Sequence, residues 1–403
     1  MESTVKTGTK GNKKNLFYIW LSVLIIWLLF ILIPSLFKQS TGVFILDSNE
    51  YASYYDRGGW IYSSGAPVSE YPQIPTYLFG LNRLISDSFS PDMHFGIFYT
   101  LFSLEMITVL FFVIKILIEM LPQTDKSFYL LLFLPPTLYY VLNRFDILPA
   151  LLCLIALHKA HEKKWIFASA LLAVATFTKW YPILLFPGFF VYASIQENKL
   201  NWKMVMAFIV ASLVILLPTF LQGGLAAVMI PYRFHLARGM EYVALPVLVN
   251  DLLVNMIVNP QAFYFVFFVL QVVSPVLCIF LKVDTFDRLV NYCILSTSIF
   301  ILFSRINSPQ WFLWLIPFLL LSITNKKDYW LVVFYNLITY IFFPIVFNMY
   351  GNSSTPLKIL AGIIYLILAI LIIRSVKRIT FVPGSFLSLI RKRVNEKTLI
   401  QEV

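Results

Sequence analysis

The chain has 403 residues, of which 59% are hydrophobic, 17% are aromatic and only 13% are charged. Soluble domains carry about 25% charged residues, so this chain has too few polar side chains to cover a water-soluble globule of its size. The composition excludes a soluble enzyme and predicts an integral membrane protein. Because backbone groups in hydrocarbon must bond within their own segment, the predicted fold is all-α.

Twelve apolar segments are predicted to be membrane-spanning helices. They cover residues 16–37, 94–121, 127–142, 146–158, 164–178, 182–196, 203–221, 260–281, 287–303, 310–324, 328–349 and 356–375. The first is about twice as long as the apolar region of a signal peptide, so it is expected to remain as a span. The spans form a single domain, 16–376, between a cytoplasmic N-terminal tail, 1–15, and a basic cytoplasmic C-terminal tail, 377–403.

The basic residues support this topology. With the N-terminus in the cytoplasm, about two thirds of the 31 Lys and Arg residues fall in or beside inner loops, as the positive-inside rule requires. This bias explains the net charge of +11 without a nucleic-acid partner. The first and fourth outer loops, 38–93 and 222–259, are long and lie on the same face. Long loops among compact elements usually carry function, so we expect the active site on the outside.

The first outer loop is predicted to contain two helices that lie in the membrane interface. Asp47 or Ser48 can cap the first helix, and the pair Gly58-Gly59 is expected to end it. The second helix follows Pro72, and its apolar residues recur near the helical period. These residues are Ile74, Leu78, Leu81 and Ile85.

Asp47 is open to two interpretations. It can be a helix cap in an interfacial loop, or a general base at the membrane surface. Glu50 and Asp56 compete with it for the second role, and the residues alone do not choose among the three carboxylates.

Basic residues occur at the ends of several predicted spans, and each has a simple structural explanation. Arg144 can form a salt-bridged turn with Asp146, Lys179 can extend toward water beside aromatic rings, and Arg305 can anchor a span end. Considered together with Asp47, however, the basic side chains come from five outer loops and can converge. They are Arg144, Lys179, Arg233, His235, Arg238 and Arg305. Several cations beside one carboxylate suit a phosphate-bearing substrate next to a base, since Arg binds phosphate bidentately and Lys binds it as a point charge.

Other chemistry has little support in the sequence. No P-loop, nucleophile elbow, zincin helix or dinucleotide fingerprint is present, and the cysteines, 153, 278 and 293, lack metal-ligand spacing. We therefore predict no cofactor and no metal site, with metal dependence left open. Glu105, inside the second predicted span, is costly in lipid and is expected to face a cavity or a partner. A protonated, structural Glu105 is the alternative.

Four short motifs follow one another over most of the chain. The first outer loop carries Asp47, a tyrosine, Gly65-Ala66-Pro67 and Glu70-Tyr71-Pro72. The later motifs are Arg144 with residues 170–175 and Lys179-Trp180-Tyr181-Pro182, then His235, Arg238-Gly239 and Glu241, then Ser308-Pro309-Gln310-Trp311-Phe312-Leu313-Trp314 with Pro317. In order and placement these motifs resemble the polytopic GT-C glycosyltransferases, especially the bacterial mannosyltransferases that use polyprenyl-phosphate-mannose.

The resemblance implies a donor whose sugar, mannose, is linked through phosphate to a long isoprenoid, and it implies Asp47 as the base. Our hypothesis is an inverting transfer to a glycolipid or lipid-linked acceptor. It assigns the donor phosphate to Lys179, Arg238, Arg144, Arg233 and Arg305, and the acceptor or sugar to His235, Glu241, Tyr51, Tyr71 and Gln310. On the same grounds the protein is expected in a prokaryotic cell membrane, among membrane lipids.

Two other classes of protein stay open. A secondary transporter or flippase for a lipid-linked glycan suits twelve spans, but it predicts ionisable groups near the middle of the membrane. Here those groups gather on one face. A non-catalytic scaffold of a glycan-assembly complex would tolerate substitution of Asp47 and Lys179 with effects on stability alone.

Overall fold

A computed structural model describes residues 47–62, 69–121, 123–253, 260–273 and 280–379, with residues 275–276 and a few positions between 18 and 25. All regular secondary structure in these ranges is helical, as predicted. The predicted span 16–37 and both predicted tails lie outside the described residues, apart from those few positions and residues 377–379.

The helices fall into two halves along the chain. The first half contains α3 (Ser48–Gly58), η2 (Gly59–Tyr62), α4 (Gln73–Ser86), η3 (Pro91–Met93), α5 (His94–Met120), η4 (Gln123–Phe133), α6 (Pro135–Asn143), α7 (Ile147–His161), α8 (Trp165–Thr176), η5 (Tyr181–Leu184) and α9 (Phe186–Gln196). The second half contains α10 (Trp202–Val228), α11 (Ile230–Ala237), α12 (Leu245–Leu252), α13 (Pro260–Val273), α14 (Phe286–Leu302), η7 (Pro309–Trp311), α15 (Phe312–Ser322), α16 (Lys326–Tyr340), the π-helical η8 (Ile341–Val346), α17 (Phe347–Tyr350) and α18 (Thr355–Ile379).

The described residues do not confirm the prediction of twelve spans. Within the described ranges four helical stretches are long and apolar enough to cross a membrane, namely Pro91–Met120, Trp202–Ala237, Lys326–Tyr350 and Thr355–Ile379. The bent pair α6 and α7, which meet at 104°, makes a fifth if it is one span. The other apolar helices have 10–17 residues, whereas a straight span needs about 20. The predicted number is therefore not confirmed, although the apolar helices fit a membrane protein.

Proline and extended backbone explain where predicted spans break. Residues 127–142 were predicted as one helix, but η4 ends at Phe133 and α6 begins at Pro135. Proline fits the first turn of a helix and not its interior, so the pair Pro135-Pro136 starts a new helix. Arg144 then adopts an extended conformation, with φ −141° and ψ 145°, and the chain bends into α7.

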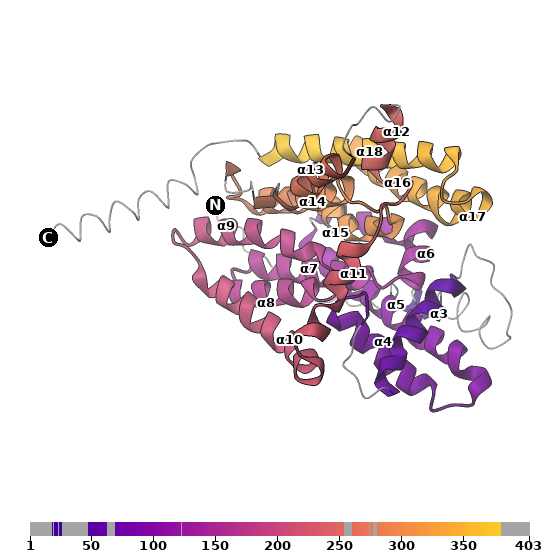
Figure 1. Ribbon diagram of the computed structural model, residues 1–403. Helices are drawn as coiled ribbons and strands as arrows, with labels where there is room; N and C mark the ends of the chain where they lie inside the picture. The colour runs from indigo at the N-terminus through magenta and orange to yellow at the C-terminus, as the bar shows by residue number, and fades with distance from the viewer. Residues whose placement is uncertain are drawn as a thin grey trace.

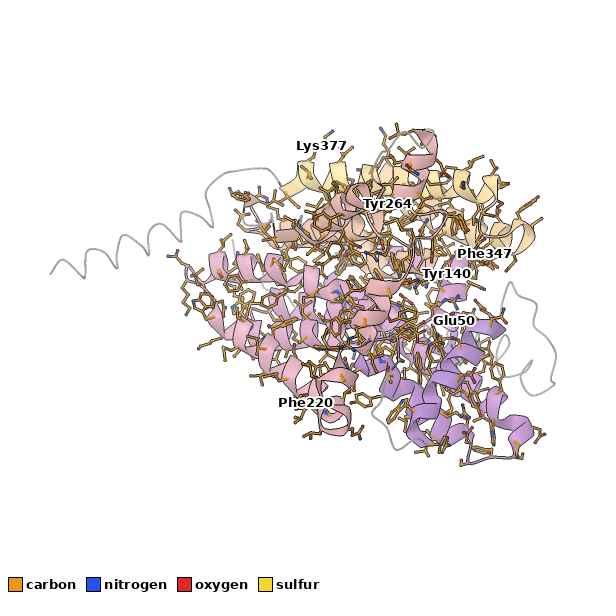
Figure 2. All side chains as sticks on the ribbon, in the orientation of Figure 1. Glu50, Tyr140, Phe220, Tyr264, Phe347 and Lys377 are labelled. Atoms are coloured by element: carbon orange, nitrogen blue, oxygen red, sulfur yellow. The ribbon has the colours of Figure 1, made fainter. Side chains whose placement is uncertain are left out.

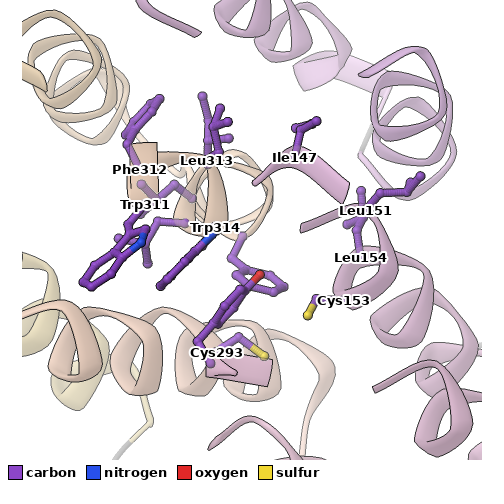
Figure 3. Packing of buried hydrophobic residues seen from close by; sticks show 14 of the residues in the cluster. Ile147, Leu151, Cys153, Leu154, Cys293, Trp311, Phe312, Leu313 and Trp314 are labelled. Atoms are coloured by element: carbon purple, nitrogen blue, oxygen red, sulfur yellow. The ribbon is translucent and has the colours of Figure 1, made fainter. Parts of the chain in front are cut away.

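The centre of the bundle is α15, which packs against α7, α14 and α16, while α18 packs against α14 (Figure 1). Nearly every residue of α15 is buried, as expected for a helix that is apolar on all sides. Trp311 stacks on Trp314 with 4.7 Å between ring centroids, and Trp314 lies between Trp311 and the labelled α7 residues in the view of Figure 3. Cys153 and Cys293 are free, buried thiols.

The two helices predicted in the first outer loop are present as α3 and α4. Asp47, rather than Ser48, is the N-cap of α3, and its side chain accepts a hydrogen bond from the Glu50 backbone N–H at 3.2 Å. Gly58 lets the two helices approach closely, because a Cβ on Gly58 would lie 2.4 Å from the Phe79 carbonyl oxygen of α4. The predicted apolar stripe of α4 faces the core only in part, since Leu81 is 51% exposed whereas Leu78 packs against the core.

The surface of α10 is strongly apolar and faces outward. Only 11% of the most apolar window in Trp202–Ala237 is buried, and Phe220 projects from α10 into open space (Figure 2). Large exposed apolar faces are rare on soluble proteins, so this face suits contact with lipid. The described part of the predicted fourth outer loop, residues 222–253, is largely helical, because α10 continues to Val228 and is followed by α11 and α12.

Candidate functional site

A cavity of about 850 Å³ lies where the helices meet their connecting loops. Its charged residues come from α3, the α6–α7 junction, the α8–η5 junction, α11 with the segment after it, and the segment between α14 and η7. These are the segments that the sequence analysis assigned to the outer face. The remaining wall is mainly aromatic and aliphatic, and it includes Phe268, Phe300 and Phe343.

Eight of the predicted site residues line this cavity. They are Tyr71, Arg144, Lys179, His235, Arg238, Glu241, Arg305 and Gln310. The other three, Asp47, Tyr51 and Arg233, are not among its lining residues. The structure therefore brings together most of the residues selected from sequence, although they are spread over 240 positions of the chain from Tyr71 to Gln310.

Arg144 connects Asp47 to the cavity. Its guanidinium donates to the Asp47 carboxylate at 2.7 Å and lies 3.8 Å from the Glu50 carboxylate. The Asp47 backbone N–H donates to the Asn143 side-chain carbonyl at 2.7 Å, so the start of α3 is held to the end of α6 by two contacts. Asp47 lies behind Arg144, while Glu50 itself lines the cavity.

Lys179 is held by a buried carboxylate and three aromatic rings. Its ammonium lies 3.4 Å from Asp146 Oδ1, and the same oxygen accepts a hydrogen bond from Trp314 Nε1 at 2.8 Å. The ammonium also lies 4.4 Å from the centroid of the Phe145 ring and 5.3 Å from that of Tyr71. Aromatic faces attract cations at such distances, so the ammonium is held by both charge and ring contacts.

The salt bridge that was one interpretation of the turn 144–146 is not formed. Arg144 turns to Asp47 on one side and Asp146 turns to Lys179 on the other. The extended backbone at Arg144 and the 104° bend between α6 and α7 separate the two charges. Lys179 does not extend into water, because only 15% of its side chain is exposed.

Arg238, Glu241 and Arg305 tie two loops together. Glu241 accepts from Arg238 at 2.9 Å and from the Asn307 backbone N–H at 2.9 Å, while the Glu241 N–H donates to the Arg305 carbonyl at 3.1 Å. Burial raises the pKa of the Glu241 carboxyl, against the opposing effects of the Asn307 N–H and Arg238. The Arg305 guanidinium donates to the carbonyls of Leu236 and Arg238 at 3.3 Å, and it has no carboxylate partner among the described residues.

His235 and Tyr71 lie on the side of the cavity next to α4. His235 Nε2 lies 3.0 Å from the Glu70 carbonyl oxygen, which ties α11 to the first outer loop. The Tyr71 hydroxyl faces Glu50 Oε1 at 3.5 Å. Burial is the main cause that raises the pKa of Tyr71, followed by the charge of Glu50, so its hydroxyl remains a donor. Gln310 lines the cavity from η7.

Two predicted site residues have other positions. Tyr51 is fully buried, contacts Tyr99 and Phe102 edge-on, and donates its hydroxyl hydrogen bond to the Leu142 carbonyl, so it supports α3 from inside the core. Arg233 is exposed on α11 and does not line the cavity. Both residues were selected for their residue type. The sequence reasoning did not predict that Tyr51 faces the core and that Arg233 faces outward.

Some residues of the site were missed by the sequence reasoning. Asp146 was regarded only as part of a turn, and Trp314 only as part of a motif, yet together they fix Lys179. Asn307 also lines the cavity, and its side-chain N–H₂ group is buried without a hydrogen-bond partner among the described residues. The sequence signal for Asp146 was a charged residue flanked by apolar segments on both sides.

Glu105, which lies inside the second predicted span, has a hydrogen-bond partner on α4. Its carboxylate accepts a hydrogen bond from the buried Asn82 side chain of α4 at 2.8 Å. Within the described ranges no group of three or more His, Cys, Asp or Glu side chains is arranged to hold a metal ion.

Comparison of the sequence with protein-family models gives no match, and comparison with curated proteins gives none either.

Proposed function

We propose that this chain is a membrane glycosyltransferase of the GT-C type. It would transfer a sugar, mannose by resemblance, from a polyprenyl-phosphate donor to a hydroxyl group of a glycolipid or lipid-linked acceptor, with inversion at the anomeric carbon. One observation carries the proposal. A single cavity combines four cations, two carboxylates (Glu50 and Glu241) and a wide apolar wall, contributed by segments far apart in the chain. A phosphate-linked sugar on an isoprenoid needs each of these surfaces.

The charges of the cavity are uneven, and this supports separate places for base and phosphate. Around Arg144 two carboxylates, Asp47 and Glu50, share one cation. Elsewhere in the cavity, Arg238 is paired with the Glu241 carboxylate, while Arg305 donates to backbone carbonyls and adds a second cation. An anionic phosphate is attracted to the second group, and a proton leaving an acceptor hydroxyl is attracted to the first.

The apolar wall supports a lipid-linked substrate. It contains Phe268 and Val272 of α13 and Phe342 and Phe347 near η8, which offer hydrocarbon contact beside the charged residues. Burial of apolar surface gives about 25 cal/mol per Å², so an isoprenoid chain can supply binding energy there without polar contacts.

In the proposed reaction a carboxylate takes the proton from the acceptor hydroxyl, and the oxygen attacks the anomeric carbon. The bond from that carbon to the phosphate oxygen breaks, and the lipid phosphate leaves with the electron pair. Base assistance contributes roughly 10²–10⁴-fold. We assign the base role to Asp47, as the resemblance implies, with Glu50 as its competitor because Glu50 lines the cavity. Lys179, Arg238 and Arg305 stabilise the leaving phosphate.

The proposal includes a multi-pass position in a prokaryotic cell membrane, with both termini in the cytoplasm and the cavity facing outside. A flippase or secondary transporter for a lipid-linked glycan is the second candidate. The break between α6 and α7 at Arg144, beside the cavity, favours it, because transporters bind substrates at discontinuous helices.

The test is transfer by purified protein. Full-length protein in detergent would be incubated with radiolabelled polyprenyl-phosphate-mannose and a lipid extract. We expect labelled lipid product from the wild type and at least ~10²-fold less from Asp47→Asn. The exposed Asp56→Asn is the matched control and is expected to transfer normally. Full activity of Asp47→Asn with loss in Glu50→Gln would move the base role to Glu50, and no transfer from any polyprenyl-phosphate sugar would favour the transporter.

A further inference from the structure

We propose that Asp146 is a positioning residue of the cavity, whose carboxylate fixes the ammonium of Lys179 for contact with an anionic substrate group. The inference rests on the proposed function, because it concerns phosphate recognition in the same cavity. Asp146 does not line the cavity, whereas Lys179 does, so Asp146 acts through Lys179.

The first observation is the loss of a capping bond. Asp146 is the N-cap residue of α7, where an aspartate side chain ordinarily accepts a hydrogen bond from the first turn. Its side chain makes no such bond. Instead Oδ1 faces the Lys179 ammonium at 3.4 Å and accepts from Trp314 Nε1 at 2.8 Å. A favourable local bond is thus replaced by contacts to two residues of the cavity wall.

The second observation is burial. Asp146 is fully buried, and its Oδ2 has no hydrogen-bond partner among the described residues. A buried carboxylate is costly unless it is paired, and a carboxylate that served structure alone would be expected to use both oxygens. The single cation at Oδ1 is therefore the main compensation for this charge.

The third observation is that Asp146 organises the wall around Lys179. Trp314, which donates to Asp146, stacks on Tyr181 with 4.2 Å between ring centroids and lies 6.0 Å from the Lys179 ammonium. Phe145, the neighbour of Asp146, places its ring 4.4 Å from the same ammonium. The carboxylate thus aligns a cation and the aromatic surfaces that enclose it.

The experiment measures discrimination for phosphate, which a purely structural residue would not change. Full-length protein in detergent is titrated with undecaprenyl phosphate and with undecaprenol, and the affinity ratio of the two lipids is compared among variants. Asp146→Asn keeps an oxygen for Trp314 but removes the charge. We expect it to lower the ratio about tenfold, the effect of losing one charge-assisted contact, and Lys179→Met to lower it at least as much.

Because Asp146 acts through Lys179, the double variant Asp146→Asn/Lys179→Met should show the ratio of Lys179→Met alone. Asp328→Asn is the matched control, since Asp328 is also buried and paired, with Arg374 and Arg378, but does not line the cavity. It should keep the wild-type ratio.

Three results would overturn the assignment: an unchanged ratio in Asp146→Asn, an equal loss of affinity for both lipids, or a further fall in the double variant. A wild type that binds both lipids equally would instead refute the phosphate site itself, and with it the proposed function.

Discussion

Replacing Arg144 by methionine should destabilise the protein far more than the loss of an exposed ion pair does. The Arg144 side chain is 8% exposed and its partner Asp47 is 14% exposed, with 2.7 Å between guanidinium nitrogen and carboxylate oxygen. Removal of one member of a buried pair costs roughly 3–5 kcal/mol, because the other charge is left without compensation. Since Asp47 and Glu50 retain some contact with solvent, we expect a value near the lower end, about 3 kcal/mol.

The structure offers a control with the same geometry and greater exposure. Lys358 and Asp251 are also 2.7 Å apart, but their side chains are 33% and 42% exposed. Exposed pairs contribute roughly 0.2–1 kcal/mol, so Lys358→Met should have a small effect. The free energy of unfolding would be measured by titration of SDS into dodecylmaltoside micelles, with helicity as the signal.

A double-mutant cycle separates the pair from other effects of Arg144. Asp47→Asn in the Arg144→Met background should recover part of the loss, because it removes the uncompensated charge. A coupling energy of about 1–3 kcal/mol is expected for residues in direct contact. Equal destabilisation by Arg144→Met and Lys358→Met, or purely additive effects in the cycle, would refute the view that burial gives this pair its importance.

Three further predictions concern single positions. Arg305→Ala should weaken binding of undecaprenyl phosphate about tenfold while leaving undecaprenol binding unchanged, because Arg305 is a cavity cation without a carboxylate partner among the described residues; equal loss for both lipids would contradict this. Burial raises the pKa of Glu241 above its ordinary value of 4.5, so its contribution to stability is present below that pH and is lost as the pH rises through the raised pKa. Glu241→Gln should remove this pH dependence of the free energy of unfolding. An unchanged pH dependence in the variant would show that Glu241 is not its cause. Gly58→Ala should cost about 1–3 kcal/mol because the new Cβ would meet the Phe79 carbonyl, whereas Gly96→Ala, with open space around it, should be neutral or stabilising by up to about 1 kcal/mol.

The presence of helices was predictable from sequence because an apolar chain in lipid has few alternatives. Both helices of the first outer loop were found, and the boundaries of α5 differ from the predicted span 94–121 by a single residue. The ends and breaks of other helices depend on backbone details that hydropathy does not contain. Residues 127–142 are as apolar as a span, yet the pair Pro135-Pro136 divides them into η4 and α6.

The direction of helix faces was harder to predict, and α4 shows why. Its apolar stripe, including Leu81, was predicted to belong to a helix lying in the membrane interface, and Leu81 is largely exposed while Thr76 and Asn82 are buried. In a membrane protein the apolar side can face lipid, and small or polar residues can face other helices, where their hydrogen bonds are satisfied. The rule that apolar residues point inward therefore fails at this helix.

Because the chain has few charged residues, their clustering in one cavity could be predicted from the sequence. The ion pairs that they form within the cavity could not. In a chain with so few charges, those at the ends of spans must find either water or one another. Arg144 and Asp146 are two residues apart, and a salt bridge between them was one interpretation of the sequence, whereas Arg144 pairs with Asp47, 97 positions away. The bend between α6 and α7 determines which partner Arg144 reaches. Such a bend, made at one extended residue, could not be predicted from the amino-acid composition of the segment.

The uneven charges of the cavity also suit the order of events in the proposed reaction. A polyprenyl-phosphate sugar is a phosphodiester with one negative charge, and the lipid phosphate that leaves gains a second charge as the anomeric bond breaks. Arg305, which lacks a carboxylate partner in the described part of the chain, can hold the first charge in the substrate. Lys179 and Arg238 are held in place by Asp146 and Glu241, so they are positioned to meet the second charge as it develops on the leaving phosphate. Interactions that strengthen only as the bond breaks lower the barrier rather than the ground state, so the paired cations are the ones expected to affect the rate of transfer.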